Sequence, residues 1–143
     1  MLISTKGRYA LRVLTDMAEH QSGGYVPLKE IAQRQEISEK YLETIVKTLV
    51  NDGILIGLRG KGGGYRLSKS PDQIKVADIL RLTEGTLSPV ACLEIGAAPC
   101  ARMTQCRTLD LWRGLNQVIN EYLEGYTIAD LMQMGGPGND YII

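Results

Sequence analysis

Residues 27–67 decide the fold and read "PLKEIAQRQEISEKYLETIVKTLVNDGILIGLRGKGGGYRL". Proline is favoured in a first helical turn, so Pro27 predicts the start of a helix over "PLKEIAQR". A short turn, "QEI", separates this helix from a second one, for which Ser38 is a favourable N-cap. The apolar residues after Ser38 recur with helical spacing and predict one buried face. They are Tyr41, Leu42, Ile45, Val46, Leu49 and Val50.

A β-hairpin is predicted directly after these two helices. Gly53 ends the second helix, and the "ILIGL" that follows is apolar but too short for a helix. The glycine-rich loop "RGKGGG" and a strand over "YRLS" complete the hairpin. Upstream, Ser4 or Thr5 can cap a further amphipathic helix. Three helices, a tight turn and a hairpin within residues 1–70 predict a winged helix-turn-helix.

The rest of the chain is predicted to be mostly helical. "SPDQIKVADILRLTEG" indicates a turn and a helix that ends at Gly85. A long amphipathic helix is predicted over 107–124. Its apolar face comprises Leu111, Trp112, Leu115, Val118, Ile119, Tyr122 and Leu123. Thr127 can cap a last short helix.

The predicted fold class is therefore mainly α with a small β-hairpin, a winged helix-turn-helix followed by a long C-terminal dimerisation helix. We expect a DNA-binding domain over 1–70 and a connecting helix with a cysteine-containing loop over 71–106. The dimerisation helix and the short terminal helix are expected over 107–134, and a tail over 135–143.

Composition and charge narrow the class of protein. Among the 143 residues there is no apolar run of membrane-spanning length and no signal-peptide pattern at the start, so we expect a cytoplasmic protein without a membrane partner. Residues 1–70 carry 11 Lys and Arg against 7 Asp and Glu, whereas residues 71–143 carry 5 against 9. A basic first half indicates a polyanionic partner.

The glycine-rich loop favours DNA over a nucleotide. An enzyme that binds a nucleotide through this loop would need a Ser or Thr after the lysine and a helix to receive the phosphate, and the sequence offers neither. As the wing of a helix-turn-helix, the loop can lie along the DNA backbone or enter the minor groove. Arg59, Gly60 and Lys61 are the predicted wing contacts, with Arg59 as the inserting side chain.

The outward face of the helix after Ser38 is the second predicted DNA contact. The predicted contacts on this helix are Ser38, Lys40, Tyr41, Glu43, Thr44 and Lys47. Glu43 differs from the others because a carboxylate repels phosphate. Two interpretations of Glu43 stay open: it accepts a hydrogen bond from a cytosine amine, or it forms a surface ion pair with Lys47 at i+4.

Three cysteines form the other candidate site. Cys92, Cys100 and Cys106 lie in an irregular segment and include no C-x-x-C pair, so a zinc site is disfavoured. The single histidine, His20, is far away in sequence, and no base is evident for nucleophilic catalysis. Thiolates in such a loop suit an iron–sulfur cluster, and inert or redox-sensing thiols are the alternative.

Taken together, these segments resemble the Rrf-two superfamily of bacterial winged-helix repressors, which includes the IscR, NsrR and CymR types. The resemblance covers nearly the whole chain and is carried by "STKGRYALRVL", "VPLKEIAQRQEISEKYLETIVKTLVNDGIL", "LRGKGGGYRLSKSPDQI" and "LSPVACLE". It implies a homodimer that crosses its long helices and reads a palindromic promoter site in double-stranded DNA. It also implies that Arg59 is the wing arginine and Glu43 the recognition-helix glutamate of the IscR type.

In the cluster-binding members, three loop cysteines hold an iron–sulfur cluster, and the resemblance assigns this role to Cys92, Cys100 and Cys106, with [2Fe–2S] as the expected cluster. The sequence departs from the IscR pattern because Leu109 stands where those proteins have a histidine ligand. The fourth ligand stays open, and Glu94, Asp110, another side chain or an exogenous molecule could supply it.

The resemblance leaves two functions in competition. The first is a regulator that senses cluster or redox status and controls genes of iron–sulfur cluster biogenesis. The second is a CymR-like repressor of sulfur and cysteine metabolism, controlled by a protein partner or by thiol oxidation without a cluster. The "SPV" before Cys92 and the final "DYII" resemble the CymR branch.

Overall fold

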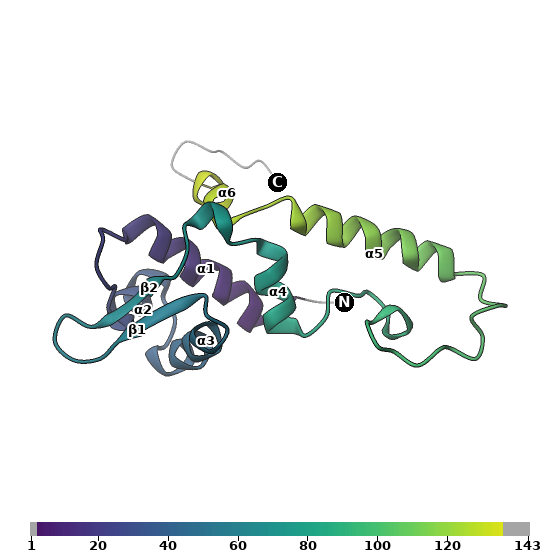
Figure 1. Ribbon diagram of the computed structural model, residues 1–143, viewed down its shortest axis with the longest axis horizontal. Helices are drawn as coiled ribbons and strands as arrows, with labels where there is room; N and C mark the ends of the chain where they lie inside the picture. The colour runs from purple at the N-terminus through teal and green to yellow at the C-terminus, as the bar shows by residue number, and fades with distance from the viewer. Residues whose placement is uncertain (1–2, 136–143) are drawn as a thin grey trace.

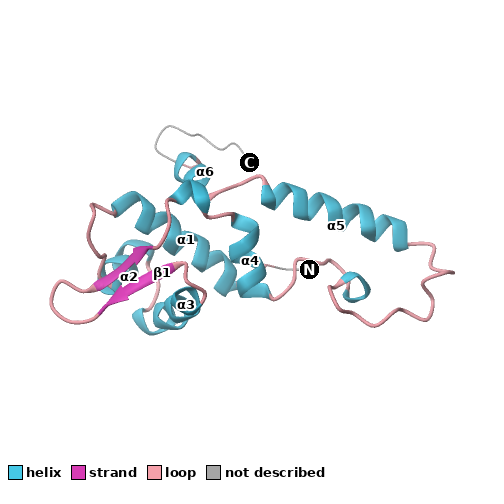
Figure 2. Ribbon diagram, in the orientation of Figure 1, coloured by secondary structure: helices cyan, strands magenta, loops and turns pink. Residues whose placement is uncertain are grey.

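The computed structural model describes residues 3–135 and has six α-helices and one two-stranded antiparallel sheet in that range. Figure 1 traces the chain and Figure 2 separates helices from strands. This arrangement confirms the predicted fold class. In chain order the helices and strands are α1 (Thr5–His20), α2 (Leu28–Gln35), α3 (Glu39–Asn51), β1 (Leu55–Leu58), β2 (Gly64–Leu67), α4 (Val76–Glu84), α5 (Leu109–Glu124) and α6 (Ile128–Gln133). Two short 3-10 helices cover Pro71–Gln73 and Ala91–Leu93.

Side-chain caps fix the starts of α1 and α3. The Ser4 hydroxyl accepts a hydrogen bond from the Gly7 amide, and the Ser38 hydroxyl accepts one from the Tyr41 amide. Such caps satisfy donors that have no partner within a helix. Pro27 precedes α2 as its N-cap rather than occupying the first turn. The α2–α3 turn is made by Glu36, the one described non-glycine residue with positive φ, at 54°.

The core of the winged helix gathers one apolar face from each of the first three helices. Fully buried members include Leu14 and Met17 of α1, Ile31 of α2, and Leu42 and Leu49 of α3. The apolar residues that recur with helical spacing in the sequence therefore face the core, as predicted. The polar residues of α3 are consequently left on the outer surface of the domain.

Two different structural requirements explain the glycines of the wing. In the hairpin, Leu55 pairs with Leu67 and Leu58 pairs with Gly64. A Cβ on Gly64 would meet the carbonyl oxygen of Val26, which bridges to the neighbouring Tyr65. By contrast, Gly60 and Gly62 have positive φ and open space around them. Close packing therefore requires glycine at the base of the wing, and backbone conformation favours it at the tip.

The helix α6 returns to the winged helix after α5. Ile128 is fully buried in the core that contains Leu14 and Met17, and Thr127 forms a capping box with Asp130. The domain boundaries stay a prediction, but Ile128 ties α6 to the core that contains the buried residues of α1.

The predicted apolar face of α5 is divided between two surfaces. Ile119 and Leu123 pack against a small apolar cluster that includes Val76 and Leu80 of α4. A second stripe on α5 faces outward and comprises Leu111, Leu115, Val118 and Tyr122, which are 63, 40, 61 and 60% exposed. One half of the face thus holds α5 to its own chain, and the other half is uncovered.

Candidate nucleic-acid interface

The helix α3 presents the predicted DNA contacts on one surface. Ser38, Lys40, Glu43, Thr44 and Lys47 are all exposed. They face away from the core because the intervening Leu42, Ile45, Val46 and Leu49 are buried. Hydroxyl, ammonium and carboxylate groups on an exposed helix can pair with phosphates and with base edges.

Tyr41 differs from the other predicted contacts on α3. Its ring is half-buried and packs edge-on against the ring of Tyr9, with centroids 5.8 Å apart. Tyr9 in turn lies under the guanidinium of Arg12 at 4.9 Å. The Tyr41 ring therefore helps to fix α3 on α1.

A groove between α3 and the wing gathers residues from both predicted contact regions. It encloses about 820 Å³, and Glu43, Lys47, Arg59 and Gly60 line it. Ser38, Lys40, Thr44 and Lys61 do not line this groove, although each is exposed. The structure thus brings four of the nine predicted contacts together and leaves the other exposed ones on adjoining surfaces.

The groove also contains residues that the sequence analysis did not predict as contacts, among them Lys29, Glu39 and Asn51. Lys29 projects from the first turn of α2, and Asn51 lies in the last turn of α3. Helix periodicity identifies both as surface residues but does not reveal that α2 and the wing lie beside each other. The bridge between Val26 and Tyr65 creates that proximity, and it links positions far apart in sequence.

The structure bears on one of the two interpretations of Glu43, the surface ion pair with Lys47. Among residues 3–135, the ion pairs include none between Glu43 and Lys47. Glu43 lines the groove instead. It is therefore available to an incoming hydrogen-bond donor.

The cysteine-containing loop is irregular apart from the short 3-10 helix at Ala91–Leu93, and its three thiols are free. Cys100 is exposed, and Cys92 and Cys106 are half-buried. Within the described part of the chain, no group of three His, Cys, Asp or Glu side chains is placed to hold a metal ion. The two candidate fourth ligands, Glu94 and Asp110, are both exposed.

Cys106 has the environment of a reactive thiol. Its sulfur lies 3.4 Å from the Thr108 hydroxyl. Hydrogen bonds from Thr108 lower the pKa of the Cys106 thiol, assisted by the Leu109 amide and the charge of Arg102. Because the thiolate is the form that binds metal and reacts with oxidants, this environment suits both functions considered for the loop.

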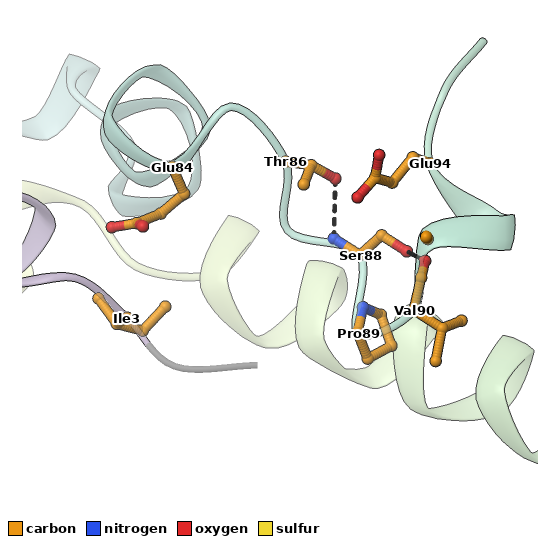
Figure 3. Close-up of a pocket in the computed structure, with 8 residues that line it drawn as sticks. Ile3, Glu84, Thr86, Ser88, Pro89, Val90 and Glu94 are labelled. Atoms are coloured by element: carbon orange, nitrogen blue, oxygen red, sulfur yellow. Dashed lines mark hydrogen bonds between the residues drawn. The ribbon is translucent and has the colours of Figure 1, made fainter. Parts of the chain in front are cut away.

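A pocket at the start of this loop adjoins the first residues of α1. It encloses about 230 Å³ and is lined by Ile3, Glu84, Thr86, Ser88, Pro89, Val90, Ala91 and Glu94 (Figure 3). The Glu84 carboxylate accepts hydrogen bonds from the Ser4 amide, at 3.1 Å, and from the Ser4 hydroxyl, at 2.6 Å. The residue that caps α1 is therefore held by the residue that precedes the loop.

The fold and this surface define a winged helix-turn-helix protein with an exposed, partly basic groove between recognition helix and wing. The chain belongs to the Rrf2 family: the family model, described as "Iron-dependent Transcriptional regulator", matches residues 3–134. Members of this family are transcriptional regulators rather than enzymes. Within residues 3–135, the helices include none that is long and apolar enough to span a membrane.

Relatives of two types are similar to this chain to nearly the same degree. The regulator IscR of Aliivibrio salmonicida is 38% identical over 132 residues, which cover 92% of this chain and 77% of IscR. The regulator CymR of Bacillus subtilis is 40% identical over 131 residues, which cover 92% of this chain and 89% of CymR.

The solved structures that are similar to this chain include the same two types, CymR and IscR. The structure of CymR, titled the global cysteine regulator of B. subtilis, has a TM-score of 0.77 at 38% identity and covers 95% of this chain and 99% of that one. T. potens IscR has a TM-score of 0.74 at 33% identity and covers 99% of this chain and 93% of that one. The family is therefore established, and the comparisons do not separate the IscR type from the CymR type.

Proposed function

We propose that this protein is a homodimeric transcriptional regulator that reads a palindromic site in double-stranded DNA with α3 and the wing. The observation that carries the proposal is the groove in which Glu43 and Lys47 of α3 lie beside Arg59 and Gly60 of the wing. In this mode, α3 enters the major groove and the wing follows the adjacent backbone or minor groove. Such a protein works in the cytoplasm, where it can reach DNA.

The uncovered stripe on α5 supports a dimer. Leu111, Leu115, Val118 and Tyr122 are exposed and fall on one side of the helix. A contiguous apolar stripe on a soluble chain marks an interaction surface. A second copy of the same helix would cover it, and two-fold symmetry would then present two recognition helices to two half-sites of a palindrome.

Two alanine substitutions test the contributions of the wing and of α3 to DNA binding separately. Arg59→Ala should weaken specific binding by about 1–3 kcal/mol, because a groove-inserted arginine contributes to site selection as well as affinity. Lys47→Ala should weaken binding to all DNA sequences similarly, because it removes one phosphate contact. It should also reduce the slope of log affinity against log salt concentration by about one. Fluorescence anisotropy over a salt titration measures both quantities.

Lys69→Ala is the matched control, since Lys69 is also an exposed cation near the hairpin but does not line the groove. It should bind DNA as the wild type does. Wild-type affinity and salt slope in both Arg59→Ala and Lys47→Ala would show that the groove does not contact DNA.

We further propose that Cys92, Cys100 and Cys106 hold an iron–sulfur cluster, [2Fe–2S] being the expected type, and that the protein controls genes of cluster biogenesis. The proposal is supported by three thiols in one loop, by the thiolate-favouring environment of Cys106 and by the similarity to IscR proteins. When bound, a cluster with a weak fourth ligand supplies sensitivity to iron, sulfur and oxygen. The separated thiols of this structure would have to be drawn together by closure of the loop.

A CymR-like repressor of sulfur and cysteine metabolism is the second candidate. It is supported by the similarity to CymR, which is about as high as the similarity to IscR. In this case a protein partner, or oxidation of an accessible thiol such as that of Cys106, would control DNA binding without a cluster.

In either case, Glu84 offers a physical route from the loop to the DNA-binding domain. It ends α4, immediately before the loop, and accepts both hydrogen bonds from Ser4, the N-cap of α1. A rearrangement of the loop can therefore alter the support of α1, on which α3 packs through the Tyr9–Tyr41 contact. The loop state must favour one DNA-binding state energetically for this route to regulate.

Replacing all three cysteines by alanine should abolish regulation but leave the fold intact. None of the thiols belongs to either apolar core, so the change in unfolding free energy should stay within about 0.5 kcal/mol, as for other surface changes. Anaerobic reconstitution with ferrous iron and sulfide, followed by absorption spectra, iron and sulfide analysis and DNA binding, provides the test. Thr104→Ala, in the same loop but without loss of a thiol, is the control.

The outcomes of this experiment separate the two candidates. Iron uptake by the wild type and by Thr104→Ala, but not by the triple variant, is the result expected for a cluster. DNA binding that responds to oxidants only when the thiols are present, without iron uptake, would instead support the CymR-like repressor. If wild type and triple variant bind DNA alike under all conditions, the loop is not a sensor through its cysteines.

A further inference from the structure

The helix α5 contains a glycine that the described residues of its own chain do not explain. Gly114 lies in the interior of α5, where glycine disfavours the helix about two- to fivefold relative to alanine. Its backbone is ordinary right-handed helix rather than the positive-φ conformation that glycine favours. A Cβ at this position would meet no atom within 4 Å among the described residues. Neither its conformation nor packing against residues 3–135 of the same chain requires glycine here.

The surroundings of Gly114 suggest a requirement from outside the chain. Gly114 adjoins Leu115 and lies one turn from Leu111 and Val118, which belong to the uncovered apolar stripe. Residues three and four apart share a helix face, so the glycine forms a gap at the edge of this stripe. Glycine leaves a helix surface where another backbone can approach closely.

The position of α5 leaves this part of the helix accessible. The C-terminal half of α5 is bound to α4, where Arg81 contacts Asn120 and Glu124 and where Leu123 joins the small apolar cluster. The N-terminal half extends away from the winged helix (Figure 1). An incoming helix can therefore cross at Gly114 without displacing the DNA-binding domain.

We infer that Gly114 is the point at which the α5 helices of two copies cross. The inference rests on the proposed homodimer and specifies its geometry. In a two-fold dimer, a residue beside the symmetry axis meets its own equivalent in the other copy. The distance between packed helices depends on the side chains at the contact, so a glycine at the crossing allows the two helices to approach closely while the leucine and valine neighbours interdigitate.

Disulfide cross-linking tests the crossing point directly. Gly114→Cys, in the chain that lacks Cys92, Cys100 and Cys106, should form a cross-linked dimer on mild oxidation. A disulfide requires Cα atoms roughly 4.4–6.8 Å apart, which only residues close to the symmetry axis satisfy. Gln117→Cys in the same background is the control, because Gln117 is also exposed on α5 but lies off the stripe. It should stay uncross-linked.

Sedimentation equilibrium provides the second readout. Gly114→Leu favours an isolated helix but fills the gap, so its dimer dissociation constant should rise at least tenfold without loss of helical circular dichroism. Glu121→Leu, one heptad further along the same helix edge, should dimerise as the wild type does.

The two claims can fail separately. A wild-type dimer with no cross-link at position 114 and unchanged dimerisation of Gly114→Leu would overturn the crossing point and leave the homodimer standing. A wild-type chain that is monomeric at all concentrations would overturn both.

Discussion

Replacing Leu115 and Val118 by Asp should yield a folded monomer that has lost specific affinity for its DNA site. Both side chains are exposed on α5 and make no contribution to either apolar core, so their replacement leaves the monomer intact. Four buried carboxylates in a dimer would be strongly unfavourable. A monomer engages one half-site, and losing the linked second site lowers apparent affinity by about 10²–10⁴-fold.

Analytical ultracentrifugation and DNA titration measure the two effects on the same samples. Gln117→Asp places a carboxylate on the polar side of α5 and should leave both mass and affinity unchanged. Ile119→Asp should instead destabilise the monomer, because Ile119 packs against the small apolar cluster with α4. A dimer of unchanged stability in Leu115→Asp/Val118→Asp would show that the stripe is not the interface.

Arg34→Met should destabilise the winged helix by about 3 kcal/mol. Asp16 is only 2% exposed, and its carboxylate accepts hydrogen bonds from the Arg34 guanidinium at 2.7 and 3.0 Å and from the Gln35 amide at 2.9 Å. Removing one partner of a buried pair leaves an uncompensated charge, which costs about 3–5 kcal/mol when both partners are buried. The lower end applies because the Arg34 side chain is 30% exposed.

The same ion pair predicts how stability depends on pH. Burial raises the pKa of Asp16, but hydrogen bonds and charge from Arg34, with Gln35 and His20, lower it more, so the folded pKa is below its ordinary value. Its contribution is therefore full above the unfolded pKa of about 3.9 and is lost as the pH falls through the folded pKa. On acidification through this range, the free energy of unfolding should fall less for Arg34→Met than for the wild type.

Chemical denaturation at neutral and acidic pH checks both expectations. Glu30→Gln is the control, because Glu30 pairs with the same arginine at 3.8 Å but is 57% exposed, and such pairs contribute little. The double variant Asp16→Asn/Arg34→Met should recover part of the loss, since it removes both charges. A loss below about 1 kcal/mol in Arg34→Met would rule out a stabilising role for this pair.

Local signals made most of the fold predictable. Ser4, Ser38 and Thr127 are caps whose side chains bond backbone amides only a few residues away, so the sequence alone locates three helix starts. The apolar periodicity of α3 predicted its buried face for the same reason. Gly53 and Gly85 likewise mark helix ends through their own conformation.

What could not be predicted depends on contacts between distant residues. The Ser4–Glu84 hydrogen bonds join residues 80 positions apart, and nothing local in either segment indicates them. The single apolar face expected on α5 proved to be two, because periodicity reveals which residues are apolar but not which neighbour covers each one. Lys29 joined the groove only through the pairing of Val26 with Tyr65.

The same distinction between local signals and long-range contacts applies to the predicted site residues. Glu43, Lys47, Arg59 and Gly60 meet in one groove because the helix-turn-helix and the hairpin are adjacent in sequence as well as in space. Whether the three cysteines come together depends on the conformation of an irregular loop, which sequence periodicity does not predict. The sequence also does not identify a fourth ligand for a cluster. Their role as cluster ligands therefore stays a prediction from the family resemblance.

Selection of binding sites from random double-stranded DNA by the purified wild-type protein tests the central claim most directly. A homodimer that reads DNA with α3 and the wing should enrich an inverted repeat whose half-site centres lie about one helical turn apart, roughly 10 base pairs. Enrichment of no sequence, or of a single half-site without a symmetric partner, would contradict a dimeric regulator that presents two recognition helices to a palindrome.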